Sequence, residues 1–167
     1  LKAGVTDKAQ FIEGDLFESD FSQATVITMF LLPDINLKLR PKILDLKPGT
    51  RIVSNSFDMA EWKADKTVSV AVEEGCKNNF CQAFLWIVPA KVEGDWKLPQ
   101  GTLTLRQEFQ MVSGVLQAGS ATRSVKNGRL NGTRISFTVG DEHYSGRVDG
   151  NAMEGTVKSA AKNTAWS

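Results

Sequence analysis

The chain has 167 residues, 41% of them hydrophobic, and its 20 basic and 19 acidic side chains leave a formal net charge of +1. This length and composition suit one ordinary domain or two small ones with a buried core. The balanced charge excludes the strong basic footprint of proteins that bind nucleic acid or anionic membrane surfaces. We therefore expect neither nucleic acid nor a membrane among its partners.

The longest apolar run, residues 24–33, has about ten residues, roughly half of what a helix needs to cross a bilayer. The first 14 residues lack the basic, apolar and small-residue order of a secretory signal. The sequence therefore predicts a soluble protein, with the cytoplasm as the default compartment.

Cys76 and Cys81 are the only cysteines, and His143 is the only histidine. Three such residues cannot supply the four ligands of a structural zinc site, so we predict no metal site. We expect both cysteines to be ordinary thiols. If oxidised, they would bridge two neighbouring strands or a hairpin.

Two apolar segments open the chain. Residues 9–17 contain Phe11 and Ile12 before the turn at Gly14 and Asp15, which predicts a short buried strand with Asp15 at its carboxyl end. Residues 24–32 form a nearly continuous apolar run, which is typical of a parallel strand covered on both faces.

A helical pattern follows. Ile35, Leu39, Ile43 and Leu46 recur every three or four residues and predict one buried helical face. Because proline disrupts a helix interior, Pro41 predicts a short turn up to residue 40 and a new helix from Pro41. A further strand is expected at residues 51–57, so the order indicates an α/β unit with parallel pairing.

The pattern then changes to antiparallel. Residues 66–72 and 83–88 resemble a hairpin, and beyond Gly94 helical periodicity disappears. We predict a fold of α/β followed by all-β, with a boundary near Glu93: a partial Rossmann-like sheet over residues 1–93 and a small antiparallel β-meander or barrel over residues 94–167. Turn signals in the second region are Asn127-Gly128, Asn131-Gly132, Gly140-Asp141 and Asp149-Gly150.

The inside of that meander is expected to carry the alternating apolar residues Leu103, Leu105, Phe109, Ile135, Phe137 and Val139. Of the larger side chains there, Trp96, Phe109, Phe137 and Tyr144 either line a ligand cavity or fill a core. We expect a filled core.

Three blocks in order, residues 11–17, 25–33 and 46–54, resemble the class I, seven-strand S-adenosylmethionine-dependent methyltransferases. The likeness covers roughly residues 1–90 and is strongest to bacterial lysine methyltransferases. It implies the C-terminal part of a methyltransferase domain with an appended β-domain. It also implies S-adenosylmethionine as the cofactor of the intact enzyme. The family's glycine-rich cofactor loop and its acidic ribose-binding residue do not occur in this sequence.

The resemblance also implies a set of site residues. Asp15 would accept a hydrogen bond from the adenine amino group while the backbone of Leu16 contacts the ring; the alternative for Asp15 is a turn carboxylate. Phe30 and Leu31 would border the methyl group of the cofactor, and Pro33 would contact the substrate.

Asp34 is the candidate catalytic residue, orienting the acceptor or taking its proton. Its alternative role is to cap the following helical turn. Phe57 and Trp62 would contact the substrate, since an aromatic pair can hold a cationic amine. Their alternative role is core or hinge packing.

Two functions follow from these observations. The first is a methyltransferase that acts on a small-molecule or protein substrate, a protein lysine being one candidate acceptor. The second is a non-catalytic binding or assembly module that pairs with another chain, or with its own copy, through exposed sheet edges.

Overall fold

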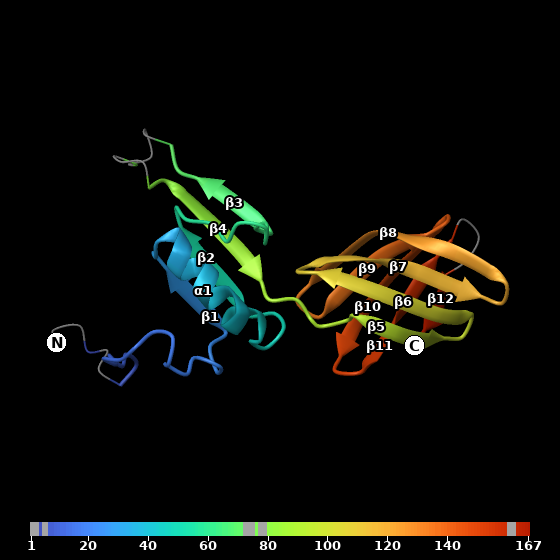
Figure 1. Cartoon of the computed structure of the whole chain (residues 1–167), viewed down its shortest axis with the longest axis horizontal. Helices are drawn as coiled ribbons and strands as arrows, with labels where there is room; N and C mark the ends of the chain where they lie inside the picture. Colours follow the sequence, from blue (N-terminus) through green and yellow to red (C-terminus); the bar gives the residue numbers. More distant parts are fainter. Residues whose placement is uncertain (1–3, 5–6, 72–75, 77–79, 160–162) are drawn as a thin grey trace.

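The computed structural model describes residues 4, 7–71, 76, 80–159 and 163–167. These residues form two sheets, one from the first half of the chain and one from the second, joined by a short connection after β4 (Figure 1). The first sheet has the order β1-β2-β4-β3 and a helix, with these bounds: β1 Val26–Met29, α1 Pro33–Leu44, β2 Arg51–Asn55, β3 Lys66–Ser69 and β4 Gln82–Ile87.

The pairing of the first sheet agrees with the sequence pattern. β1 and β2 are parallel, with Ile27 opposite Ile52, and α1 connects them. β4 is antiparallel to both β2 and β3, as the hairpin pattern predicts. The first sheet is therefore mixed, and α1 lies against β1 and β2 (Figure 1).

The predicted break at Pro41 is wrong, because α1 is continuous with Pro33 in its first turn and Pro41 inside it. An interior proline costs a helix about 3 kcal/mol. Leu39 is 3% exposed and Ile43 is 1% exposed, and burying such side chains contributes roughly 1.5–3 kcal/mol each. Burial of this helical face therefore outweighs the missing hydrogen bond.

Two further predictions about the first half are wrong. Residues 9–17 form no strand, and Phe11 is 92% exposed, because no described strand lies beside this segment to pair with it. β1 is an edge strand with one open face, and Val26 is 42% exposed, since α1 packs only on the face that carries Ile52 and Trp86.

The second sheet is a consecutive antiparallel meander that curls into a half-barrel (Figure 1). Its order is β12-β11-β10-β9-β8-β7-β6-β5. The bounds are β5 Gly94–Leu98, β6 Gly101–Glu108, β7 Met111–Ala118, β8 Ala121–Asn131, β9 Arg134–Val139, β10 Glu142–Asp149, β11 Ala152–Lys158 and β12 Asn163–Trp166.

Side chains fill the inside of the second sheet, as expected. Phe137 and Tyr144 are buried and stacked with ring centroids 4.8 Å apart, and Trp96 packs against the same core. The indole of Trp166 lies over Gly146, where an added Cβ would come within 2.7 Å of the ring. Phe109 does not join this core, contrary to the prediction, and packs against the core of the first sheet.

Gly132, Gly140 and Gly150 lie in tight turns between strands and have φ angles near 60°, which glycine adopts without steric cost. Asn127-Gly128 is not a turn, contrary to the prediction. It lies inside β8 at a register shift between Lys126 and Arg129. Asn127 has a φ of 53°, a conformation that asparagine tolerates at a bulge.

The expectation of ordinary thiols is wrong, because Cys76 and Cys81 form a disulfide. Their Cα atoms lie 5.8 Å apart, within the range that a disulfide spans. Within the described ranges, no helix has the length and apolarity needed to cross a bilayer. The same residues contain no group of three or more His, Cys, Asp or Glu side chains placed to hold a metal ion.

Candidate functional site

Three phenylalanine rings meet at one edge of the first sheet, and we call Phe30, Phe57 and Phe80 the aromatic cluster. Phe30 and Phe57 stack with centroids 5.8 Å apart, and Phe80 lies 5.4 Å from Phe30 and 6.0 Å from Phe57. Phe30 follows β1 and Phe57 follows β2, so both stand at the carboxyl ends of parallel strands. Open α/β sheets bind ligands at this edge.

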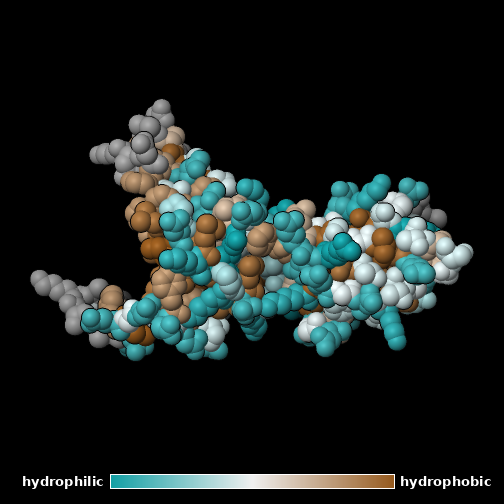
Figure 2. All heavy atoms as spheres, viewed as in Figure 1, coloured by the Kyte–Doolittle hydropathy of each residue, from teal (hydrophilic) through white to brown (hydrophobic). Residues whose placement is uncertain are grey.

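The aromatic cluster is open to solvent. Phe30 is 58% exposed, Phe80 is 47% exposed, and the neighbouring Leu32 is 62% exposed. Figure 2 shows hydrophobic side chains gathered over the first sheet, whereas the same face of the second sheet is more hydrophilic. A contiguous exposed apolar patch marks a surface that contacts another molecule.

Hydrogen bonds from α1 and β2 fix the segment that carries Phe57. The buried Asn36 amide donates through Nδ2 to the carbonyl oxygens of Phe57, at 3.3 Å, and Asp58, at 3.1 Å. The Ser54 hydroxyl donates to the same Phe57 oxygen at 2.6 Å. Ser56 has a φ of 63°, a left-handed conformation that turns the chain sharply after β2. These bonds hold the Phe57 backbone beside Phe30.

Asp34 lies at the same edge, exposed in the first turn of α1. Leu32 is the N-cap residue, and no side chain caps the helix, so Asp34 does not make the capping bond considered as its alternative role. Its carboxylate instead lies near the positive end of the helix dipole. Its catalytic role stays a prediction, as does the substrate contact of the exposed Pro33.

The structure keeps Asp15 and Leu16 apart from the aromatic cluster. Asp15 Oδ1 accepts a hydrogen bond from the Phe17 backbone N–H at 2.8 Å, the geometry of a turn carboxylate. The Lys42 ammonium donates to the Phe17 oxygen at 2.9 Å. Lys42 lies eight residues beyond Asp34, about 12 Å further along the helix axis. The predicted adenine contacts of Asp15 and Leu16 therefore stay predictions.

The other predicted site residues divide between the edge and the core. Phe57 is half-buried in the aromatic cluster, and Leu31 packs against the core beneath it. Trp62 is fully buried, with ring centroids 6.0 Å from Phe109 and 6.1 Å from Trp86. Trp62 thus takes the packing role that was its alternative.

Sequence reasoning missed Asn36 and Phe80. Asn36 had a usable signal, since it lies three residues before Leu39 and seven before Ile43, on the apolar face of the helix. Phe80 had none, because its place in the aromatic cluster depends on the pairing of β4 with β2.

Three titratable groups have shifted pKa values. A hydrogen bond from Arg40 lowers the pKa of Glu61, and the Ser22 backbone N–H lowers the pKa of Asp20. Burial raises the pKa of the Tyr144 phenol. None of the three belongs to the aromatic cluster, which offers π faces and apolar surface. Such a surface suits an alkyl chain that ends in a cation.

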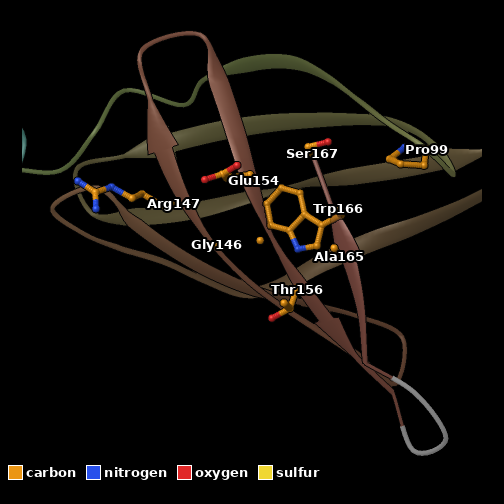
Figure 3. A pocket seen from close by; sticks show the side chains of 9 residues that line it. Pro99, Gly146, Arg147, Glu154, Thr156, Ala165, Trp166 and Ser167 are labelled. Carbon is orange, nitrogen blue, oxygen red and sulfur yellow. The ribbon is translucent and has the colours of Figure 1, made fainter.

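A separate hollow of about 580 Å³ lies on the second sheet, with Trp166 at its centre (Figure 3). Glu154 and Arg147 lie on one side of the indole and Pro99 on the other. The Trp166 Nε1 atom is buried and has no hydrogen-bond partner among the described residues. The lining residues all come from the second sheet, so this hollow is not part of the aromatic cluster.

The described residues do not form a complete S-adenosylmethionine site. Only one described strand leads directly into a helix, and this connection, from β1 to α1, contains no glycine. Pro33 in its first helical turn has no backbone N–H. A close backbone approach to the cofactor is therefore not available there, and we derive no reaction step through the cofactor.

Known proteins resemble the first half of the chain. Residues 1–66 match the family described as the ANTKMT methyltransferase domain. A "Protein-lysine N-methyltransferase" of Saccharolobus islandicus (strain REY15A) is 42% identical over 88 residues, which are 52% of this chain and 52% of that protein. A lysine N-methyltransferase of Mus musculus, named after the ATP synthase, is 29% identical over 73 residues, 43% of this chain and 30% of that protein.

Among solved structures, the "RNA methyltransferase from Salinibacter ruber in complex with S-Adenosyl-L-homocysteine" is 43% identical, with a TM-score of 0.48. That match covers 57% of this chain and 58% of the other. The chain thus spans about half the length of the first curated relative. Phe30, Asp34, Phe57 and Trp62 lie in the part of the chain that is similar to a methyltransferase domain.

Proposed function

We propose that the protein takes part in S-adenosylmethionine-dependent methylation and that its acceptor is a protein lysine. The observation that carries this proposal is the aromatic cluster, whose rings Phe30 and Phe57 belong to the segment that matches a methyltransferase domain. The names of two relatives, each a lysine N-methyltransferase, support the choice of acceptor.

The chemistry of the aromatic cluster fits a lysine side chain. A lysine offers a four-carbon stem for apolar contact and an ammonium group for a ring face, and one such exposed cation–π contact contributes about 0.5–1 kcal/mol. We propose that Phe30 and Phe57 hold the stem and that Asp34, at the same edge, orients the amine. S-adenosylmethionine would supply the methyl group.

The first sheet would correspond to part of a Rossmann-like sheet, with β1 and β2 as two of its parallel strands. In that arrangement β1 has a free edge, and Val26 on this strand is 42% exposed. We propose that a second copy of the chain pairs along this edge, because an unpaired strand is a template for another strand.

Calorimetric titration of the native gene product with S-adenosylhomocysteine tests the central proposal. We expect binding, together with transfer of radiolabelled methyl groups to a lysine-containing protein and not to the same protein with its lysines acetylated. The absence of any heat of binding would contradict a methyltransferase role.

A further inference from the structure

The β6–β7 hairpin of the second sheet reaches the core of the first sheet. Phe109 and Gln110 form the turn between β6 and β7. Phe109 has a φ of 53°, a left-handed conformation that aromatic residues rarely adopt. This conformation accompanies a change of core: the ring leaves its own sheet and packs with Trp62 and the residues around it.

The turn makes specific contacts with the segment after β2. The Phe109 ring stacks on Trp62 with centroids 6.0 Å apart and planes inclined by 13°. The Gln110 side chain, 3% exposed, donates from Nε2 to the Lys63 carbonyl oxygen at 2.7 Å. Arg40 of α1 also lies over the Phe109 ring, with Cζ 5.3 Å from the centroid. Phe109 therefore lies among groups from different parts of the first sheet and its helix.

The contacted segment is continuous with the aromatic cluster. Residues 56–62 begin with the sharp turn at Ser56, carry Phe57, and end at the buried Trp62. Helix α1 holds one part of this segment, because Asn36 binds the Phe57 carbonyl and Arg40 Nη1 donates to the Met59 carbonyl at 2.9 Å. The second sheet holds the other part through Phe109 and Gln110.

A salt bridge beside this contact fixes the same two sheets. Arg129 Nη2 of β8 lies 2.7 Å from Asp65 Oδ1, whose side chain is 6% exposed. Asp65 Oδ2 also accepts the Ile87 backbone N–H at 2.8 Å. The second sheet is thus held against the first by polar contacts as well as by the ring stack.

We propose that Phe109 is a positioning residue, through which the second sheet orders residues 56–62 and so keeps Phe57 in the aromatic cluster. The second sheet then acts on the candidate acceptor site without touching the acceptor. The functional part of this inference rests on the proposed role of the aromatic cluster; the ordering of the segment does not.

Amide hydrogen exchange on the whole chain tests the ordering directly. In Phe109→Ala, we expect the amides of Phe57, Ala60 and Trp62 to exchange about tenfold faster or more, while those of Leu103 and Leu105 in β6 keep their protection. Met111→Ala is the matched control, since Met111 lies in the same hairpin but is 49% exposed. It should leave both groups of amides unchanged.

Two more variants separate the ring from the turn. Phe109→Gly removes the ring but suits the left-handed φ, so it should loosen residues 56–62 as Phe109→Ala does. Phe109→Tyr keeps the ring and should restore protection. The proposal is overturned if the glycine variant keeps wild-type exchange, if all amides of the chain accelerate equally, or if the tyrosine variant behaves like alanine.

The functional consequence has its own readout. Where methylation is measurable, Phe109→Ala should raise KM for the lysine acceptor several-fold with a smaller change in kcat, and Phe109→Tyr should restore KM. Unchanged KM together with faster exchange would overturn the link to the acceptor site. Exchange needs neither cofactor nor acceptor, so its outcome is independent of the calorimetric test of the proposed function.

Discussion

The ring of Phe30 stacks on the ring of Phe57, with centroids 5.8 Å apart and planes inclined by 18°. The two residues are 27 positions apart in sequence and meet because β1 and β2 are parallel and end at the same edge. This contact is what turns two isolated aromatic residues into a surface that can hold a lysine side chain.

Removing either ring should weaken acceptor binding without unfolding the chain. Phe30→Ala and Phe57→Ala each remove one π face, worth about 0.5–1 kcal/mol, so KM for a lysine peptide should rise roughly two- to fivefold. Val68→Ala is the control, because Val68 is an exposed apolar residue on the edge strand β3. An equal rise in KM in all three variants would mean that general apolar surface, and not the stacked rings, holds the acceptor.

Asn36 should be important for stability as well as for the position of Phe57. Asn36→Leu leaves the Phe57 and Asp58 carbonyl oxygens without the amide donor, which we expect to cost about 1–3 kcal/mol in the free energy of unfolding. Chemical denaturation measures this loss. Asn55→Leu, at an exposed position, should change stability by less than about 0.5 kcal/mol. Similar losses at both positions would contradict the role of the Asn36 bonds.

Tyr144 should make the second sheet sensitive to alkaline pH. Burial raises the pKa of its phenol above the ordinary value of 10.0, and its hydroxyl contacts Gln100 and Glu142, each at 3.0 Å. Below pH 10.0 both the folded and the unfolded chain keep the proton. Above it the unfolded chain loses the proton first, so stability falls as pH rises through the folded pKa.

Thermal unfolding between pH 8 and 11, followed by circular dichroism, checks this sign. The decline above pH 10.0 should be shallower in Tyr144→Phe than in the wild type. At pH 8 the same variant should be less stable by about 1 kcal/mol, because it lacks the hydroxyl hydrogen bonds. Parallel declines in the two proteins would exclude Tyr144 as the cause.

The free edge of β1 should make association depend on concentration. Sedimentation velocity of the wild type should show dimers that increase with concentration, whereas Val26→Lys should be monomeric, since a lysine on an edge strand opposes pairing. Thr122→Lys, on β8 inside the second sheet, is the matched charge control and should still dimerise. A wild-type monomer at every concentration would contradict pairing through this edge.

Elements with a regular pattern were predictable from the sequence. The spacing of Leu39 and Ile43 predicted the buried face of α1, and alternation predicted the antiparallel second sheet with its filled core. The parallel pairing of β1 with β2 followed from the order of elements. In each case the side chains that set the pattern are also those that become buried.

Features that depend on distant contacts were not predictable. Pro41 stays in a helix because tertiary burial compensates for its cost, and residues 9–17 form no strand because no described neighbour pairs with them. Phe109 leaves its own sheet through a left-handed turn that local sequence does not indicate. Of the candidate site, Phe30, Asp34 and Phe57 were predicted from the resemblance, whereas Phe80 and Asn36 required the three-dimensional pairing.

Binding of S-adenosylhomocysteine to the native gene product is the most direct test of the central claim. Titration calorimetry should give a saturable heat with one site per chain, and Phe30→Ala should keep cofactor binding while weakening binding of a lysine peptide. No saturable heat in the wild type would contradict a role in S-adenosylmethionine-dependent methylation.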